Sequence, residues 1–320
     1  MSECFFEVLR PGINSTFQDK GRYGVQYMGL APGGAMDYQS FLLANALLGN
    51  EKNTGAIEFV YQGPLLKLIK GKTKIAITGN VFFKIISVQK GEIIGEPYRS
   101  YDLNEGDTLD ILATKASVYG YLSVEGGFKL DKFCGSVSSQ PRAFIGPNEG
   151  KKLELKGKIL ISNNSANKEN KIIRDIKFEE KNFIHILPGP QFHYFSQESR
   201  KEFFSTPYTV TKQTDRMGMR LAGKSLKNLV NPNIPSEGII KGAIQVPGDG
   251  NPIILMSDHP TTGGYPKVGS VISADYDYLS QQIPNKQIHF QLITVEAAEQ
   301  EFKSYIAKIN RLIASIEITS

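Results

Sequence analysis

The sequence has little of the chemistry that builds disulfide frameworks or metal centres. It contains only two cysteines, Cys4 and Cys134, which lie far apart and form no Cys-x-x-Cys pair. The four histidines show no His-Glu-x-x-His spacing and no grouping with the cysteines. A disulfide framework is therefore not indicated, and we predict no metal site on this chain.

Long apolar runs and blocks of like charge are also missing. No stretch of about 18 apolar residues occurs, so an ordinary membrane-spanning helix is not expected. The first residues lack the long apolar run of a signal peptide. The net charge of +5 is spread along the chain, which favours a lysine-rich surface over nucleic-acid binding. We therefore expect a cytoplasmic protein that binds neither a membrane nor nucleic acid, with a mild bias towards an anionic substrate.

Several standard catalytic motifs are absent as well. The chain has no Gly-x-x-x-x-Gly-Lys-Ser/Thr phosphate loop and no strand followed by Gly-x-Gly-x-x-Gly and a helix. It also has no Gly-x-Ser-x-Gly turn that would expose a nucleophilic serine. The sequence therefore offers no self-contained nucleophile.

What the chain does have is many short β-branched segments separated by Gly, Pro and Asn turns. This spacing is typical of barrels and sandwiches rather than of a β–α–β array. We therefore predict a mainly β protein. The clearest predicted strands are Leu65–Ile69, Lys74–Thr78, Thr108–Leu112, Ser117–Val124, Ile239–Val246, Pro252–Ser257 and Ile288–Ile293.

Three segments are predicted to be helical, each after a side chain that can cap the free backbone N–H groups of a first turn. The last segment carries apolar residues every seven positions. Because the pattern covers little more than three heptads, we expect this helix to pack on the protein's own barrel rather than to form a coiled coil with a partner. The predicted helices are Tyr38–Leu48 after Asp37, Gln197–Phe204 after Ser196, and Val295–Ile316 after Thr294.

A polar, charged stretch, Asn163–Asp175, is the best candidate for a domain boundary because it cannot build a core. It predicts an N-terminal β domain over residues 1–165 and a C-terminal domain over 176–320. Short matches occur in the same order in both halves, which favours two related β domains. Examples are Gln18 to Gly24 with Gln213 to Gly218, and Gly55 to Glu58 with Gly242 to Gln245.

Charged residues in the second half are the candidates for catalysis. Arg216 can present a planar fork of donors to a carboxylate or phosphate, although an Asp–Arg structural pair is the alternative. Asp258 follows a predicted strand, where it can act as an acid or base or orient another group, and Lys267 can neutralise an anion. We therefore predict Asp258, Arg216 and Lys267 as catalytic residues, and leave Arg220 open between a rim residue and a ligand contact.

A glycine-containing loop between these charges is the candidate for substrate binding. Paired glycines let backbone N–H groups approach a ligand closely, although many Gly-Gly loops are only hairpin turns. Gln245 is a polar residue in an apolar strand, so it either bonds to the backbone or points at a ligand. His259 titrates near neutrality but is set aside in favour of its neighbours. The predicted substrate-binding residues, expected to share one site with Arg216 and Asp258, are Gln245, Thr261, Thr262, Gly263, Gly264, Tyr265 and Pro266.

A set of short motifs along nearly the whole chain resembles a known family. They are Arg10-Pro11-Gly12, Thr16 to Gly24, Gly34 to Asp37, Ala44-Asn45, Gly49-Asn50, Val124 to Gly127, Asp215 to Leu221, Ser236-Glu237-Gly238, Ile244 to Pro247 and Thr261 to Lys267. The chain resembles the family variously called allophanate hydrolase subunit 2, the biotin-dependent carboxyltransferase family and the 5-oxoprolinase C subunit. The resemblance implies a pair of β-barrel-like domains, the second cyclophilin-like, with a few peripheral helices. Pro260 stands where the family has Gln.

The resemblance implies three alternative functions. The first is the C component of an ATP-dependent 5-oxoprolinase, a hydrolase complex that converts 5-oxo-L-proline to L-glutamate with partner subunits of the A and B types. The second is the carboxyltransferase component of a biotin-dependent urea or allophanate pathway, and the third is an antagonist of a histidine-kinase inhibitor. The chain has no biotin-carrier segment and no ATP-grasp glycine pattern, which favours the first. ATP is then the cofactor of the complex, and we expect this chain to be inactive alone.

Overall fold

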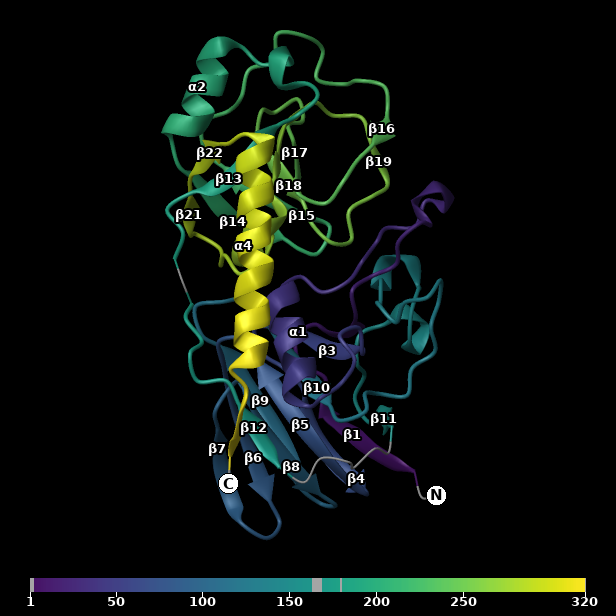
Figure 1. The fold of residues 1–320 in the computed structure, drawn as a ribbon. Helices are drawn as coiled ribbons and strands as arrows, with labels where there is room; N and C mark the ends of the chain where they lie inside the picture. The colour runs from purple at the N-terminus through teal and green to yellow at the C-terminus, as the bar shows by residue number, and fades with distance from the viewer. Residues whose placement is uncertain (1–2, 163–168, 179, 320) are drawn as a thin grey trace. The chain divides into compact units, whose positions relative to one another are not determined.

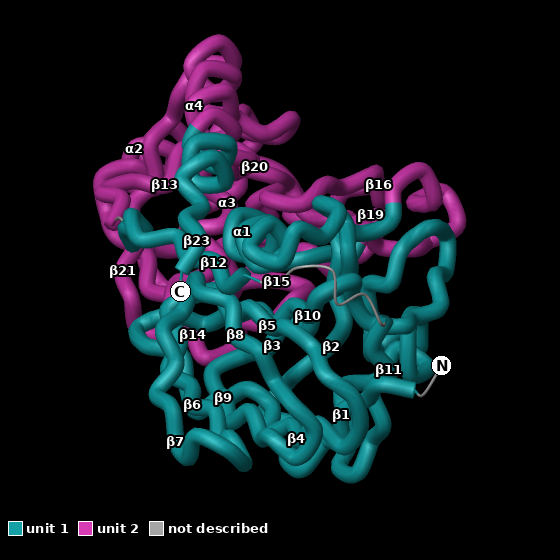
Figure 2. Tube along the Cα trace, turned by 60° about the horizontal axis from the view of Figure 1, so that its bottom comes forward, with its two compact units in different colours: residues 1–22, 33–178, 308–320 teal, residues 23–32, 179–307 magenta. Residues whose placement is uncertain are grey.

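The computed structural model describes residues 3–162, 169–178 and 180–319. It is mainly β, with 37% strand and 19% helix, as predicted. The described residues form two compact units that interleave along the chain (Figures 1 and 2): residues 1–22, 33–178 and 308–320 in unit 1, and residues 23–32 and 179–307 in unit 2. The domain prediction divided the chain only once. None of the described helices is long and apolar enough to cross a membrane.

Unit 1 contains two antiparallel sheets. The first has the order β11 (Lys158–Ile161), β1 (Cys4–Arg10), β4 (Leu65–Lys70), β9 (Thr108–Thr114), β6 (Val81–Ser87) and β7 (Gly91–Gly95). The second has the order β2 (Ser15–Gln18), β3 (Ala56–Val60), β10 (Tyr119–Val124), β5 (Lys72–Thr78), β8 (Arg99–Asn104), β12 (Asn170–Ile172) and β23 (Glu317–Thr319).

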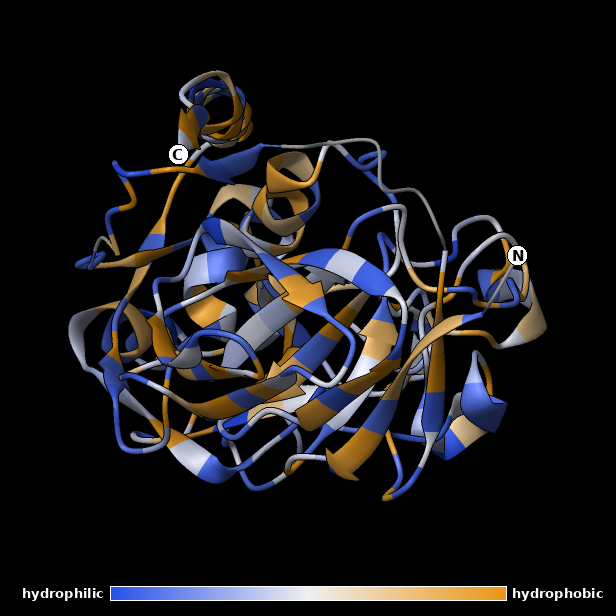
Figure 3. Cartoon of the chain, turned by 90° about the horizontal axis from the view of Figure 1, so that it is seen from below, coloured by the Kyte–Doolittle hydropathy of each residue, from blue (hydrophilic) through white to orange (hydrophobic). Residues whose placement is uncertain are grey.

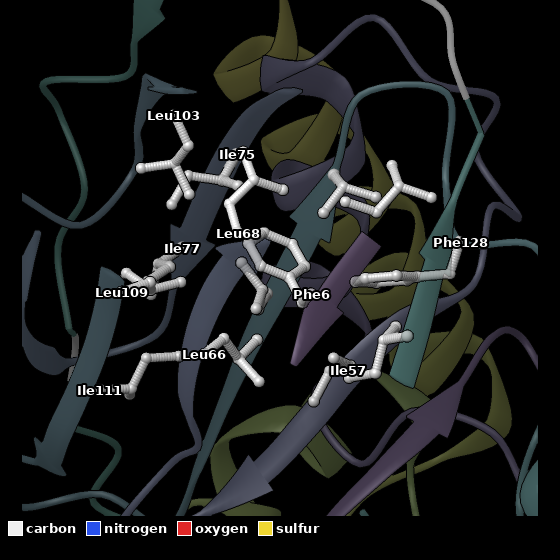
Figure 4. Close-up of a cluster of buried hydrophobic side chains, with 14 of the residues drawn as sticks. Phe6, Ile57, Leu66, Leu68, Ile75, Ile77, Leu103, Leu109, Ile111 and Phe128 are labelled. Carbon is white, nitrogen blue, oxygen red and sulfur yellow. The ribbon is translucent and has the colours of Figure 1, made fainter. Parts of the chain in front are cut away.

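The core of unit 1 is made by side chains from both of its sheets. Phe6, Leu66 and Leu109 of the first sheet pack with Ile57 and Ile77 of the second, and all five are fully buried (Figure 4). Orange and blue alternate along several strands in Figure 3, as expected where one face of a strand is buried and the other polar.

Helix α1 (Tyr38–Leu47) contacts β10 and β5 of the second sheet, and the predicted cap is present. The carboxylate of Asp37 accepts a hydrogen bond from the backbone N–H of Ser40 at 2.9 Å, which satisfies one free donor of the first turn. The end of the chain packs on the same cluster as α1, through Leu312, Ile313 and Ile316.

Part of the predicted boundary stretch Asn163–Asp175, residues 163–168, lies outside the described residues. The remainder contains the strand β12, in which Ile172 is fully buried. Asn170 accepts a hydrogen bond from the Nζ of Lys74 at 2.9 Å. A polar stretch therefore forms a strand of the second sheet here, because its neighbours β8 and β23 come from distant parts of the chain.

Unit 2 is built on one eight-stranded sheet. Its order is β21 (Gln287–Ile288), β14 (Tyr208–Thr214), β15 (Gly218–Ala222), β18 (Ile253–Leu255), β17 (Ala243–Gln245), β20 (Lys267–Val271), β13 (Ile184–Pro188) and β22 (Phe290–Leu292). A separate two-stranded ribbon pairs β16 (Glu237–Gly238) with β19 (Thr262–Gly263).

The predicted strand Ile288–Ile293 is split at His289, and the split explains the barrel-like form of this sheet. Ile288 pairs with Tyr208 at one edge of the sheet, whereas Phe290 pairs with Ile184 at the other. Because one short segment joins both edges, the sheet is nearly closed on itself. The cyclophilin-like assignment stays a prediction.

All three predicted helices are present. The predicted third helix is α4, which ends at Ala314 rather than at Ile316. The remaining helices are α2 (Gln197–Ser205), α3 (Tyr276–Ser280), α4 (Val295–Ala314) and the 3-10 turns Gln26–Met28, Pro141–Ala143, Asn148–Gly150, Phe192–Tyr194 and Ser273–Asp275.

Candidate functional site

Two of the predicted catalytic residues, Arg216 and Asp258, form an ion pair with each other. Arg216 lies in the turn between β14 and β15, and Asp258 follows β18; Gly218 pairs with Leu255, so the two side chains meet at one end of these strands. The Nε of Arg216 lies 2.8 Å from Oδ2 of Asp258, and Nη2 lies 2.8 Å from Oδ1. The side chains are only 7% and 12% exposed.

This geometry is the Asp–Arg pair that the sequence left open for Arg216. A bidentate pair of this kind fixes the plane of the guanidinium and compensates both charges away from water. Since both oxygens of Asp258 accept from Arg216, the carboxylate is placed to orient Arg216 rather than to take a proton from a substrate. The backbone N–H of Asp258 also donates to the carbonyl of Arg216 at 2.7 Å, which locks the turn.

The third predicted catalytic residue, Lys267, is buried beside Glu237 and Gln191. Its ammonium group forms an ion pair with Oε1 of Glu237 and donates to the carbonyl of Tyr265 at 3.2 Å. Gln191 donates from Nε2 to the same Oε1 at 2.8 Å, and its own Oε1 accepts from the backbone N–H of Lys267 at 3.2 Å. Hydrogen bonding to Lys267 is the main cause that lowers the pKa of Glu237 below its ordinary value.

Gln245 lies directly opposite Lys267 in the β17–β20 pair and is only 6% exposed. Its Nε2 has no hydrogen-bond partner among the described residues. A Cβ atom built on Gly263 would overlap this Nε2, so only glycine at position 263 leaves room for the amide. Gln191, Glu237, Gln245, Gly263 and Lys267 therefore form one group, called the lysine cluster below.

Backbone hydrogen bonds hold the loop from Thr261 to Pro266. The carbonyl groups of Thr261, Gly264 and Pro266 accept from Ile239, Ile234 and Val246 at 3.1, 2.9 and 2.9 Å. Thr262 and Gly263 form the strand β19, so this segment is one side of a ribbon rather than a hairpin turn. Tyr265 is 39% exposed.

The two glycines of this loop are not in the left-handed region of the backbone, so positive φ is not the reason for glycine. At Gly264 a Cβ would lie 2.9 Å from the carbonyl oxygen of Ile234. Gly264 therefore requires glycine because a backbone oxygen approaches closely, whereas a side chain at position 263 would displace the flexible amide of Gln245.

The strand register separates the predicted site residues into two groups. Gln245 pairs with Ile253 at the start of β18, whereas Asp258 follows Leu255 at its end. The lysine cluster and the Arg216–Asp258 pair therefore lie towards opposite ends of β18. The structure joins Lys267, Gln245 and Gly263, and it does not place Gln245 beside Arg216 and Asp258.

His259, which was not chosen as a base from the sequence, is almost fully buried next to Asp258. Its Nδ1 lies 2.7 Å from the carbonyl oxygen of Pro260, and a carbonyl can only accept, so Nδ1 carries the hydrogen and Nε2 is left as an acceptor. Burial is the main cause that lowers the pKa of His259 below its ordinary value of 6.5. This is the protonation state of a base near neutral pH, and no local sequence pattern shows the burial that causes it.

Gln191 and Glu237 belong to the lysine cluster although neither is among the predicted site residues. Glu237 stands in the motif Ser236-Glu237-Gly238, which was noted only as part of the family resemblance. Gln191 follows a Gly-Pro turn and carries no motif, so only the tertiary structure identifies it. Among the described residues no group of three or more His, Cys, Asp or Glu side chains is arranged to hold a metal ion.

In unit 1, Met36 and Asp37 of one family motif bond to a buried pair, Glu58 and Tyr121, inside the core. The hydroxyl of Tyr121 donates to Oε2 of Glu58 at 2.6 Å, and the same oxygen accepts from the backbone N–H of Met36 at 2.8 Å. The backbone N–H of Asp37 donates to the hydroxyl of Tyr121 at 2.8 Å. Burial raises the pKa of Tyr121 well above its ordinary value, so the hydroxyl stays a donor. These contacts give Met36 and Asp37 a structural role in positioning the start of α1.

Comparison with known proteins matches residues 28–292 to the family described as the carboxyltransferase domain, subdomain A and B. The chain is 33% identical over 310 residues to the 5-oxoprolinase C subunit of Haemophilus influenzae, covering 96% of this chain and 98% of that protein. It is 31% identical over 293 residues to the 5-oxoprolinase C subunit of Escherichia coli, covering 91% and 92%.

Longer proteins contain a similar domain. The chain is 29% identical to the urea amidolyase of Saccharomyces cerevisiae, covering 96% of this chain but only 18% of that protein. The crystal structure of the Kluyveromyces lactis urea amidolyase matches with a TM-score of 0.87 and 26% identity, over 98% of this chain and 20% of that chain. The same domain thus makes up almost all of some relatives and a small part of others.

Proposed function

The chain belongs to the family of carboxyltransferase domains with subdomains A and B, and from that premise we propose that it is the C subunit of a 5-oxoprolinase. The observation that carries the proposal is the match over more than nine-tenths of both chains with two proteins of that name. In the urea amidolyase the matching part is a small fraction of a much longer protein. We therefore base the proposed activity of this chain on the two 5-oxoprolinase proteins.

The proposed reaction is the ATP-dependent opening of the lactam of 5-oxo-L-proline to L-glutamate. The bond between the carbonyl carbon and the ring nitrogen breaks, and water supplies the hydroxyl of the new carboxyl group and the proton for the amine. ATP activates the amide oxygen, because an unstrained amide is a poor electrophile, and a second water is consumed as the ATP is converted to ADP and phosphate. Donors fixed before the reaction stabilise the negative charge that develops on that oxygen.

This chain contributes fixed donors to that reaction in our proposal. Arg216, held in one plane by Asp258, is the donor proposed for the amide oxygen. Lys267 and Gln245 lie side by side on neighbouring strands, towards the other end of β18, and are proposed to hold another part of the substrate. Orientation of this kind lowers the barrier because the donors need no reorganisation during the chemical step. The ATP site and the remaining catalytic groups belong, in the same proposal, to partner subunits of the A and B types, so the chain alone is inactive.

Carboxyl transfer is the second candidate function, favoured by the structural match to the urea amidolyase. It requires a partner that carries biotin, because the carboxyl group must arrive on a carrier. Activity that depends on a biotinylated partner, with no 5-oxo-L-proline-dependent ATP hydrolysis, would support this candidate instead.

Reconstitution tests the proposal. Mixed with partner subunits of the A and B types from the same organism, the chain is expected to give ATP hydrolysis that depends on 5-oxo-L-proline and yields glutamate. Omission of the chain is expected to abolish the activity. Equal activity with and without the chain contradicts the proposal.

A variant pair adds residue-level information to the same assay. Arg216→Lys keeps the charge but loses the bidentate fork, and we expect kcat to fall about 100-fold, the order seen when one transition-state donor is lost. Arg220→Lys, at an exposed position on the following strand, is the matched control and is expected to keep full activity. Thermal melts of both variants show whether the loss is one of folding.

A further inference from the structure

One buried donor of the lysine cluster has no acceptor within the described part of the chain. The Nζ of Lys267 and the Nε2 of Gln191 both donate to Oε1 of Glu237. The Nε2 of Gln245, on the strand next to Lys267, is buried and has no partner among the described residues. A buried amide without a partner is unfavourable, so a vacant donor of this kind indicates an acceptor that arrives from outside.

Glu237 is the least firmly placed member of the cluster. Lys267 is 5% exposed at its side chain, whereas Glu237 is 41% exposed. Glu237 belongs to the two-residue strand β16 of the ribbon, outside the eight-stranded sheet that carries Lys267 and Gln245. A two-residue ladder at the surface opens at lower cost than the sheet, because few backbone bonds and little apolar surface hold it.

We propose that Glu237 holds the place of a ligand carboxylate, and that a carboxylate-bearing substrate displaces it from Lys267 and accepts a second hydrogen bond from Gln245. Exchange of one carboxylate for another keeps the buried ammonium group paired at every stage, whereas a neutral ligand would leave it without a counter-ion. The cluster therefore selects for the carboxylate of its ligand. The identification of that ligand as 5-oxo-L-proline rests on the proposed function, but the carboxylate class does not.

Binding to the full chain tests this exchange. Isothermal titration is expected to show binding of 5-oxo-L-proline and none of 2-pyrrolidinone, the same lactam ring without the carboxylate. Glu237→Gln removes the competing charge but keeps an oxygen for Gln191, so the carboxylate ligand is expected to bind about tenfold more tightly, the order of one charge-assisted hydrogen bond. Lys267→Met is expected to weaken binding at least tenfold by the same reasoning.

The matched control is Glu202→Gln. Glu202 forms a comparable ion pair with Lys224 at 3.2 Å on the surface of the same unit, and its replacement is expected to leave binding unchanged. Weaker or unchanged binding in Glu237→Gln overturns the exchange, because a purely structural Glu237 could not improve affinity when it is removed. Equal binding of the two lactams also overturns the exchange. It is overturned as well if 5-oxo-L-proline binds neither the chain nor the reconstituted complex and glutamate shows no binding either.

The same measurements separate this inference from the proposed function. If the complex hydrolyses ATP in response to 5-oxo-L-proline but Glu237→Gln does not lower the KM for it, the exchange is wrong and the function stands. If that hydrolysis is absent but Glu237→Gln still tightens the binding of glutamate to the chain, the exchange stands and the function is wrong.

Discussion

At the level of single residues, burial sets the charge state of His259 and gives a testable pH dependence. Its pKa is lowered in the folded protein, chiefly by burial, from the ordinary value of 6.5. Above about pH 6.5 neither state binds the proton, so the residue contributes nothing. Below that pH the unfolded chain takes up the proton and the folded chain does not, until the lowered pKa is reached.

The stability of the folded chain is therefore expected to fall as the pH decreases from about 6.5 towards the lowered pKa of His259. Urea denaturation across this pH range is the measurement. His259→Gln is expected to make the stability depend less on pH in this range. His193→Gln, at an exposed position, is expected to lose stability at acid pH as the parent chain does. An unchanged slope in His259→Gln would contradict the interpretation.

Part of this residue-level picture follows from the sequence. Gln245 is buried in an apolar strand and its Nε2 has no partner among the described residues, so the ligand contact that was one of its two alternatives stays a prediction. A structural Asp–Arg pair was the alternative left open for Arg216, but Asp258 was not identified as its partner. The counter-ion of Lys267 was not foreseen, because Glu237 and Gln191 reach it from two separate segments.

At the level of elements, the ribbon β16–β19 offers a matched pair of glycines. A Cβ at Gly263 would overlap the Nε2 of Gln245, whereas a Cβ at Gly238, on the other strand of the ribbon, meets nothing within 4 Å. Gly263→Ala is therefore expected to push the Gln245 amide out of place and to lower the activity of the reconstituted complex about tenfold, the order of one lost hydrogen bond. Gly238→Ala is expected to keep the activity.

The thermal stability of the two variants completes this test. Gln245 ends in a flexible amide that can rotate away, so Gly263→Ala is expected to lower the melting temperature only slightly. Similar activity in Gly263→Ala and Gly238→Ala would show that the position of the Gln245 amide is unimportant.

At the level of the whole molecule, the last residues of the chain return to unit 1. Ile316 packs against the cluster that contains Leu43 and Leu47 of α1, and Glu317–Thr319 pairs with β12. Ile318 on the same strand is 63% exposed. Unit 1 is therefore completed by a segment that follows all of unit 2 in the sequence.

This arrangement predicts different costs for two neighbouring substitutions. Ile316→Asp places a charge against an apolar cluster and is expected to destabilise unit 1 by about 2 kcal/mol or more. Ile318→Asp, at an exposed position, is expected to change the stability by about 0.5 kcal/mol or less. Chemical denaturation of both variants, followed by tyrosine fluorescence, makes the comparison; equal losses would contradict the packing of Ile316.

The sequence by itself determined the class of the fold, the helix α1 with its Asp37 cap, and the family. These depend on local patterns: turn residues between β-branched segments, one capping side chain, and short motifs such as Thr261 to Pro266. Only the tertiary structure decided that Lys267 meets Glu237 and Gln191, that Arg216 and Asp258 neutralise each other, and that residues 308–320 complete unit 1. The physical reason is that strand register and burial, which set these contacts, depend on residues far apart in the chain, and no local pattern encodes them.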